Sequence, residues 1–453
     1  MPPAPKLLAP GPRGLPLLGN ARVFGANPPA ALAAWTAAHG PVVRFHIGPM
    51  VAHVITHVEG VQHVLVDNYS NYHKAPRMNF LSDFLGMSLL TLEDDGWKRR
   101  RKLAQPAFHK KRLVEMSEPM VAHANRMVDG WAPTIASGAP LDISAQMTRI
   151  TLGVVGEALF GVDMGELTAE IEALLPLVLK HTLDRMNSVV PLPLSFPTPA
   201  NRRYHAARTR LHTVVGEMIA RLRAGRHQAR GVMAMLMDAR DEETGAGLTD
   251  EELRSEAMTL MFAGHETTAN ALSWTWWLLA QNPEAAARLR EEVRAALGTR
   301  APTADDLPAL AYVANVVQEA MRLMPPSWAI GRMPLEDDEV LGFHIPAKSM
   351  VLLAPCVTHR DPTQWPDPDR FDPDRFTPAR SVGRHRMAYI PFSAGPRVCI
   401  GASFSMMEAT LIVAVVTQRA QLELDPTQEV SVEPSLTLRP RDGIRMIVRG
   451  AEA

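Results

Sequence analysis

A single cysteine near the C-terminus, Cys399, lies in a run of residues suited to holding a metal-bound thiolate. The run from Phe392 to Gly401 reads Phe-Ser-Ala-Gly-Pro-Arg-Val-Cys-Ile-Gly. A glycine-rich loop that opens a helix offers an anionic sulfur backbone N–H groups and the positive helix end. We expect Gly395 and Gly401 to let the backbone approach the sulfur, and Arg397 to lower the thiol pKa and reach an anionic cofactor. The alternative is a small, buried, apolar cysteine.

A second group with chemical potential lies in the middle of a long apolar segment, at Ala263-Gly-His-Glu-Thr-Thr268. A capping-box pattern at Thr249 and the Asn282-Pro pair predict a helix of about thirty residues between them, about 45 Å long. Its middle is apolar on all sides, which is typical of a buried helix. A buried Glu266 therefore needs a partner or a function. Alternatively, the threonines only bond preceding carbonyls and Gly264 only permits close packing.

These two segments resemble the cytochrome P450 superfamily of haem-thiolate monooxygenases. The cysteine run fits that family's Phe-x-x-Gly-x-Arg-x-Cys-x-Gly loop, and the second segment fits its (Ala/Gly)-Gly-x-(Asp/Glu)-Thr-(Thr/Ser) pattern. The resemblance implies that Cys399 ligates a haem iron and that Ala263 and Gly264 lie against the cofactor. It also implies that Thr267 contacts bound oxygen and that Glu266 relays protons for O–O cleavage.

A third segment of the family pattern, Glu319-x-x-Arg322, lies on a helix that we expect from Pro308 to Met324, where two prolines stop it. Two charges at this spacing share one helix face, and alone they indicate only a solvated pair. The resemblance implies a buried triad with Arg375. Because burying such ions is costly, we expect the triad to fix the register of the cysteine loop rather than to add net stability.

A fourth segment, Trp97-x-x-x-Arg101, places two hydrogen-bond donors four residues apart on one helix face. The resemblance implies that both contact a propionate of haem b (iron protoporphyrin IX), together with Arg332 and Arg397. Arg332 rests on its position alone, and an arginine without a motif is usually exposed.

The substrate pocket is the least determined part of the sequence. By position in the family, mostly apolar side chains are expected to form it, which favours a hydrophobic small molecule. Fatty acids, terpenoid or steroid-like rings and aromatic molecules all stay open. The expected pocket residues are Phe80, Phe84, Phe262, Ala263, Trp328, Ile330, Leu436 and Thr437.

A basic run between Lys98 and Arg112 holds eight Lys or Arg residues and no acid. It is either a solvated helix face or a surface that steers an acidic electron donor, a ferredoxin or flavodoxin served by a separate NAD(P)H-dependent reductase. No flavin- or nucleotide-binding glycine pattern follows Cys399, so we expect the electrons to come from a separate protein.

Composition agrees with a large helical enzyme. The 453 residues are 46% hydrophobic and carry a net charge of −1, which gives no indication of a nucleic-acid partner. We predict a mainly α fold with small β-sheets (α+β), as a single domain over 1–453 with β-rich parts near 40–60, 335–355 and 428–450. The other cysteine, Cys356, is expected to be a packing residue. No apolar run near Met1 resembles a membrane anchor or signal peptide, so we expect a cytoplasmic, bacterial protein.

The sequence therefore predicts a monooxygenase that uses O2 to hydroxylate or epoxidise a hydrophobic substrate. A hydrogen-peroxide-dependent peroxygenase is a second possibility, which the retention of Glu266 and Thr267 disfavours. A non-catalytic haem-thiolate sensor or binding protein is a third.

Overall fold

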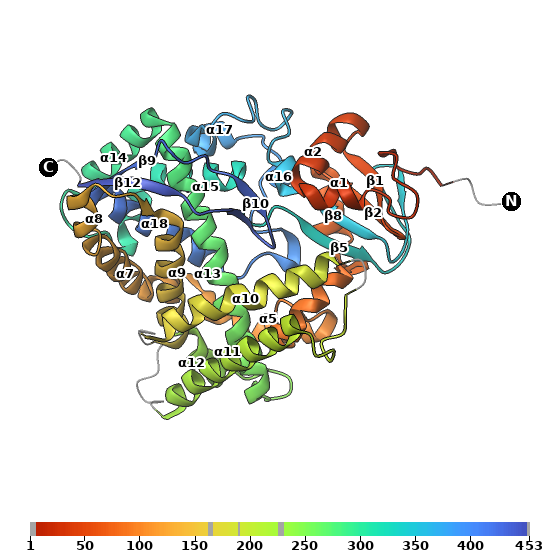
Figure 1. Cartoon of the computed structure of the whole chain (residues 1–453), viewed down its shortest axis with the longest axis horizontal. Coiled ribbons are helices and arrows are strands. Elements are labelled where there is room, and N and C mark those ends of the chain that lie inside the picture. The colour runs from red at the N-terminus through yellow and green to blue at the C-terminus, as the bar shows by residue number, and fades with distance from the viewer. Residues whose placement is uncertain (1–5, 162–165, 189–190, 225–230, 451–453) are drawn as a thin grey trace.

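The computed structural model describes residues 6–161, 166–188, 191–224 and 231–450, and helices form most of this chain (Figure 1). The α-helices of the described residues are α1 (Ala21–Ala26), α2 (Pro28–His39), α3 (Val58–Gln62), α4 (Ser82–Leu85), α5 (Asp94–Ala104), α6 (Lys110–Glu115), α7 (Ser117–Asp129), α8 (Ala132–Ser137), α9 (Ile143–Phe160), α10 (Glu166–Asn187), α11 (Pro199–Ala224), α12 (Val232–Asp238), α13 (Asp250–Gln281), α14 (Pro283–Leu297), α15 (Ala311–Leu323), α16 (Pro355–Thr358), α17 (Pro378–Ser381) and α18 (Ala402–Arg419).

Helix α13 crosses the centre of the molecule and confirms the long helix that the sequence predicts. Its first turn is closed by the predicted capping box: the backbone N–H of Glu252 donates to Thr249 Oγ1 at 3.2 Å, and that of Thr249 donates to Glu252 Oε2 at 2.8 Å. The helix packs most extensively on α9. Gly264 permits this approach, because a Cβ there would lie 3.0 Å from Val155 Cγ2.

The sheets are small and lie outside the helical core, as the sequence predicts. The largest has the order β1-β2-β8-β5-β3 and carries α1 and α2 at one end of the molecule (Figure 1). A second has the order β4-β12-β9, and β6-β7 and β10-β11 are two-stranded. The strands are β1 (Val42–Ile47), β2 (Met50–Ile55), β3 (Tyr72–Lys74), β4 (Leu141–Asp142), β5 (Ile330–Pro334), β6 (Asp338–Val340), β7 (Phe343–Ile345), β8 (Met350–Leu353), β9 (Ala420–Leu424), β10 (Val432–Pro434), β11 (Leu438–Pro440) and β12 (Arg445–Gly450).

One predicted boundary was wrong. The helix expected from Pro308 begins at Ala311, because Ala304–Ala309 forms a separate 3₁₀ turn that contains Pro308. Proline lacks the N–H that would continue an α-helical ladder through this point. Among the described residues, no helix combines the length and apolar character that crossing a membrane requires.

Candidate active site

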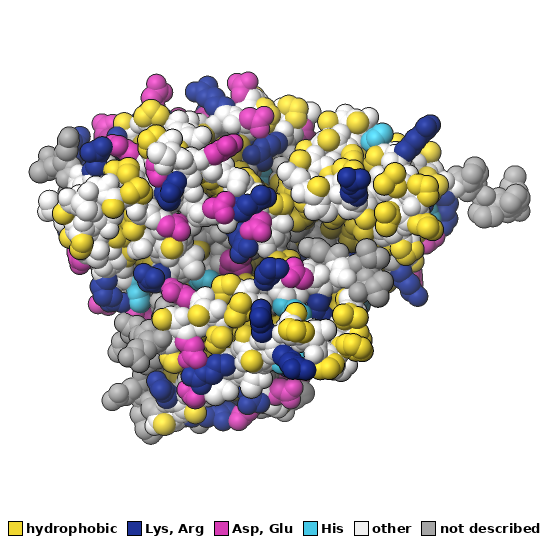
Figure 2. Space-filling model, viewed as in Figure 1, with side chains coloured by type: hydrophobic (Ala, Val, Ile, Leu, Met, Phe, Trp, Pro, Cys, Tyr) yellow, Lys and Arg dark blue, Asp and Glu magenta, His cyan; other side chains and the backbone are white. Residues whose placement is uncertain are grey.

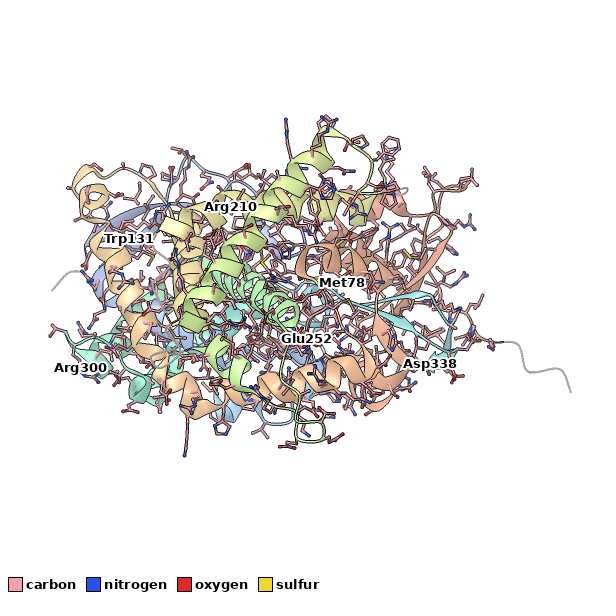
Figure 3. The ribbon with its side chains drawn as sticks, turned by 90° about the horizontal axis from the view of Figure 1, so that it is seen from below. Met78, Trp131, Arg210, Glu252, Arg300 and Asp338 are labelled. Carbon is pink, nitrogen blue, oxygen red and sulfur yellow. The ribbon has the colours of Figure 1, made fainter. Side chains whose placement is uncertain are left out.

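A cavity of about 430 Å³ lies between the middle of α13 and the loop of residues 391–401, which we call the cysteine loop. Most of its lining is apolar, and basic side chains also line it. In Figure 3, Met78, which lines the cavity, and Glu252, in the first turn of α13, are labelled. The apolar lining includes Met78, Leu81, Leu90, Phe108, Leu159, Phe262, Ile330, Phe404 and Leu436.

Cys399 faces this cavity directly before α18, and its accessible surface belongs to the cavity wall. Its backbone N–H donates to Phe392 O at 2.9 Å, which closes the cysteine loop. Burial raises the pKa of the thiol, and the backbone N–H of Gly401 and the charge of Arg101 oppose this only in part. The protein groups around Cys399 therefore favour the thiol over the thiolate.

The structure corrects two expected roles in the cysteine loop. Gly395 does not approach the sulfur: its φ is +68° and a Cβ would lie 1.9 Å from Leu65 O, so this glycine lets the loop lie against residues 63–67. Gly401 does lie near the sulfur, since a Cβ there would be 3.9 Å from Cys399 Sγ. The cation that acts on the thiol is Arg101, which donates to Val398 O at 2.9 Å, rather than Arg397.

Four basic side chains line the cavity: Lys74, Arg101, Arg332 and Arg397, which we call the cation cluster. Arg397 pairs with Glu93, and its guanidinium lies 4.0 Å from the centre of the Trp97 ring. Burial, followed by the charge of Arg397, lowers the pKa of Lys74 to about 7. Burial and Arg397 likewise lower the pKa of Arg332 to about 10. A set of crowded cations with one carboxylate between them fits a ligand that carries two carboxylates.

The expected propionate contacts therefore all line the same cavity. Trp97, Arg101, Arg332 and Arg397 all line the cavity, as do Phe392, Ala263 and Gly264. The sequence reasoning missed Lys74, which lies on the three-residue strand β3. A lysine without a motif gives no signal in the sequence, and only the fold places it beside the arginines.

Of the acid and the threonine predicted on α13, only Thr267 lines the cavity, and Glu266 does not. Thr267 lines the cavity, and its Oγ1 donates to Ala263 O at 2.7 Å. This is the bond to a preceding carbonyl that we gave as the alternative to a role in oxygen chemistry. Glu266 does not line the cavity, and its Oε1 accepts from Thr437 Oγ1 at 2.6 Å. Burial raises the pKa of Glu266 above its usual range. The predicted need of this acid for a partner is thus met by a threonine hydroxyl from the C-terminal part of the chain.

Glu319, Arg322 and Arg375 form a buried group, as the resemblance implies. Arg322 donates to both carboxylate oxygens of Glu319, at 2.6 and 2.8 Å, and Arg375 Nε lies 3.3 Å from Glu319 Oε1. Arg322 Nη1 donates to His359 O at 2.9 Å and to Pro368 O at 2.6 Å, and His359 Nε2 accepts from the N–H of Ile390 at 2.9 Å. The triad is therefore connected to the start of the cysteine loop.

Three of the residues expected in the substrate pocket are absent from the cavity lining. Phe84 lies behind Phe262, packed edge to face at 6.4 Å between ring centres. Phe80 packs under the guanidinium of Arg185 at 4.6 Å, and the Trp328 indole donates to Ser435 O at 2.9 Å. The other expected pocket residues do line the cavity: Phe262, Ala263, Ile330, Leu436 and Thr437.

A further acid near the site, Glu408 on α18, was also missed. It is fully buried beside the hydroxyl of Thr268, and burial raises its pKa well above the usual range. Nearby, Thr268 Oγ1 and Ser405 Oγ lie 3.0 Å apart and join α13 to α18 at the cavity wall. The sequence does contain a signal for Glu408, because this acid stands within the otherwise apolar segment that forms α18.

The basic run of residues 98–112 is less positive than its sequence suggests. Each of five members lies near an acid, and Arg101 turns inward. The face shown in Figure 2 likewise carries acidic and basic side chains interspersed. The five ion pairs are Lys98–Asp95 at 2.9 Å, Arg99–Glu252 at 3.1 Å, Arg100–Glu256 at 2.9 Å, Lys102–Glu242 at 2.9 Å and Arg112–Glu115 at 3.2 Å.

A thiol that faces an apolar cavity, basic side chains in the same lining and a threonine on the facing helix fit a haem-thiolate site. The family model for cytochrome P450 matches residues 9–448, and the chain belongs to this family. Cyclooctatin synthase from Streptomyces melanosporofaciens is 38% identical over 95% of this chain and 93% of its own length. Cyclooctat-9-en-7-ol 5-monooxygenase from the same organism is 33% identical over 92% and 89%. Pentalenene oxygenase from Streptomyces avermitilis is 31% identical over 92% of each chain. The chain is thus a haem-thiolate monooxygenase, an oxidoreductase.

Proposed function

We propose that this enzyme inserts one oxygen atom from O2 into a cyclic terpenoid hydrocarbon, by hydroxylation or epoxidation. The observation that carries the proposal is the apolar cavity bounded by Cys399 on one side and by Ala263 and Thr267 on the other. Two of the relatives act, by their names, on a cyclic alkenol and on pentalenene. The apolar lining fits a substrate with few polar groups, and the names of these relatives favour a ring system among the classes that the sequence left open.

The residues of the cavity fit haem b, and we assign them to it. The cation cluster would hold the two propionates, with Trp97 as a further donor, and Cys399 would supply the sulfur ligand of the iron. A haem held by a thiolate supplies O2 activation, because electron density from the sulfur favours O–O cleavage.

The remaining steps belong to this chain's own residues. Apolar side chains such as Phe262 and Leu436 exclude water and hold the substrate against the reacting centre. We assign proton delivery to Glu266, whose pKa burial raises above its usual range, and donation at the oxygen site to Thr267. Glu319, Arg322 and Arg375 are assigned to holding the cysteine loop in register.

Electrons are proposed to come from a separate ferredoxin or flavodoxin. The basic run offers limited support for its docking, because most of its charges are paired, and the proposal rests on the family. We also propose that the chain forms a single domain, which is supported by the largest of its three apolar core clusters, because that cluster spans Leu81 to Val448.

The test is turnover of a cyclic terpenoid alkene by the purified enzyme with a surrogate ferredoxin, its reductase, NADPH and isotopically labelled O2. Incorporation of one labelled oxygen atom per product is the expected result. Product formed only with hydrogen peroxide would make the enzyme a peroxygenase. Haem binding with no product under either condition, across a panel of terpenoid, fatty-acid and aromatic compounds, would favour a sensor or binding protein.

A further inference from the structure

We propose that Thr437 and Asn270 position the carboxyl group of Glu266 and direct its transferable proton to Oε2. The proposal deepens the function proposed above, because it concerns how the assigned relay acid is held.

Thr437 lies in the turn between β10 and β11, and this turn is fixed against α13. The Trp274 indole of α13 donates to Leu438 O at 2.9 Å, and the N–H of Leu438 donates to Pro326 O at 2.9 Å. Thr437 is only 4% exposed, so its hydroxyl has a defined place beside the helix. The turn thus presents one hydroxyl to α13 at the level of Glu266.

The hydrogen bonds at Thr437 have a fixed direction. Asn270, one turn after Glu266 on α13, donates from Nδ2 to Thr437 Oγ1 at 3.0 Å. Because a hydroxyl carries a single hydrogen, that hydrogen points to Glu266 Oε1, 2.6 Å away. Asn270 therefore holds the hydroxyl in the orientation that donates to the acid.

This direction decides which oxygen of Glu266 carries the proton. Oε1 accepts from Thr437, so a proton taken up by the carboxylate goes to Oε2. Oε2 is buried and has no hydrogen-bond partner among the described residues. The proton is thus held at the oxygen that Thr437 does not engage, so its transfer does not break the hydrogen bond that positions the carboxyl group.

The surroundings of Glu266 contain little charge that could replace this arrangement. The charged group that acts on it is Arg439 of β11, which is itself paired with Glu433 at 2.8 Å. The hydrogen bond from Thr437 is the larger of the two influences that favour the ionised acid, and burial outweighs both.

The decisive variant is Thr437→Val, which keeps the side-chain shape and removes the hydroxyl. We expect unchanged haem content, but a roughly tenfold loss of product per NADPH consumed, with the electrons released as hydrogen peroxide. The pH at which coupled turnover declines should move upward, because the ionised form of Glu266 loses a hydrogen bond. Thr437→Ser should restore both properties.

A spectroscopic measurement tests the proposal independently of turnover. The infrared carbonyl band of protonated Glu266 is identified by its loss in Glu266→Gln. In Thr437→Val it should shift to higher frequency, because the carbonyl oxygen no longer accepts a hydrogen bond. If no substrate is turned over but this shift is seen, the proposed function fails while the positioning role stands.

Two further variants complete the design. Thr275→Val is the matched control, because this buried threonine on α13 donates to Ala271 O at 2.8 Å. The variant should change neither the product formed per NADPH nor the infrared carbonyl band. Asn270→Leu should produce the same infrared shift, more weakly, which keeps the test open if Thr437→Val folds poorly. An unmoved band in the Thr437 and Asn270 variants, or equal losses in Thr275→Val, overturns the proposal.

Discussion

Replacing Glu319 by glutamine should remove much of the stability of this protein. The carboxylate accepts from Arg322 at 2.6 and 2.8 Å and from the N–H of Asp372 at 2.8 Å, and Arg375 Nε lies 3.3 Å away. The Glu319 and Arg322 side chains are 0% exposed and that of Arg375 is 3% exposed, so the variant leaves two buried cations without a counter-charge. Breaking a buried pair in this way costs about 3–5 kcal/mol, against a total of about 5–15 kcal/mol for a folded protein.

The matched control is Asp374→Asn. Asp374 lies two residues after Asp372 and pairs with Arg288 through both carboxylate oxygens, at 2.7 and 2.9 Å. The Asp374 and Arg288 side chains are 33% and 54% exposed. Solvent screening limits such a pair to about 0–1 kcal/mol. Urea unfolding followed by circular dichroism, with haem content measured in parallel, compares the two variants. A Glu319→Gln protein within about 1 kcal/mol of wild type, with full haem content, would refute the proposed role of the triad.

Three further results are expected. Cys399→Ser should fold but lose the thiolate signature and oxygenation, and full activity would contradict the ligand assignment. Lys74→Met should lower haem affinity by about 10–100-fold below pH 7, since a charged hydrogen bond contributes about 1.5–3 kcal/mol. The difference in haem affinity between Lys74→Met and wild type should shrink as the pH rises above 7. The pKa of Lys74 is about 7 when no cofactor is bound, so above that pH the neutral amine must first take up a proton to pair with a carboxylate. Equal slopes of haem affinity against pH for the two proteins would refute this. Gly395→Ala should prevent haem retention because a Cβ meets Leu65 O at 1.9 Å, whereas Gly25→Ala, with nothing within 4 Å, should be silent in the same absorbance assay.

The sequence predicts those parts of the fold that depend on local signals. The capping box at Thr249 and the apolar middle of α13 gave a helix whose bounds the structure confirms. The strands that were missed, such as β3 and β4, have two or three residues, too few for an alternating pattern to emerge.

The candidate site divides in the same way. Motif residues such as Trp97 and Arg397 were predicted to meet at one ligand, and the fold places both in the lining of the same cavity. Contacts between distant segments have no local signal: Thr437 and Glu266 are 171 positions apart in the chain. The same is true of Lys74, which joins the arginines only when β3 pairs with β5.

The most direct test of the account is the ferrous–CO difference spectrum of the purified, haem-loaded protein. Thiolate ligation by Cys399 predicts a strongly red-shifted Soret band in the wild type that is lost in Cys399→Ser. A band at the position typical of histidine- or thiol-ligated haem, or failure of the protein to bind haem, would contradict the assignment of this site.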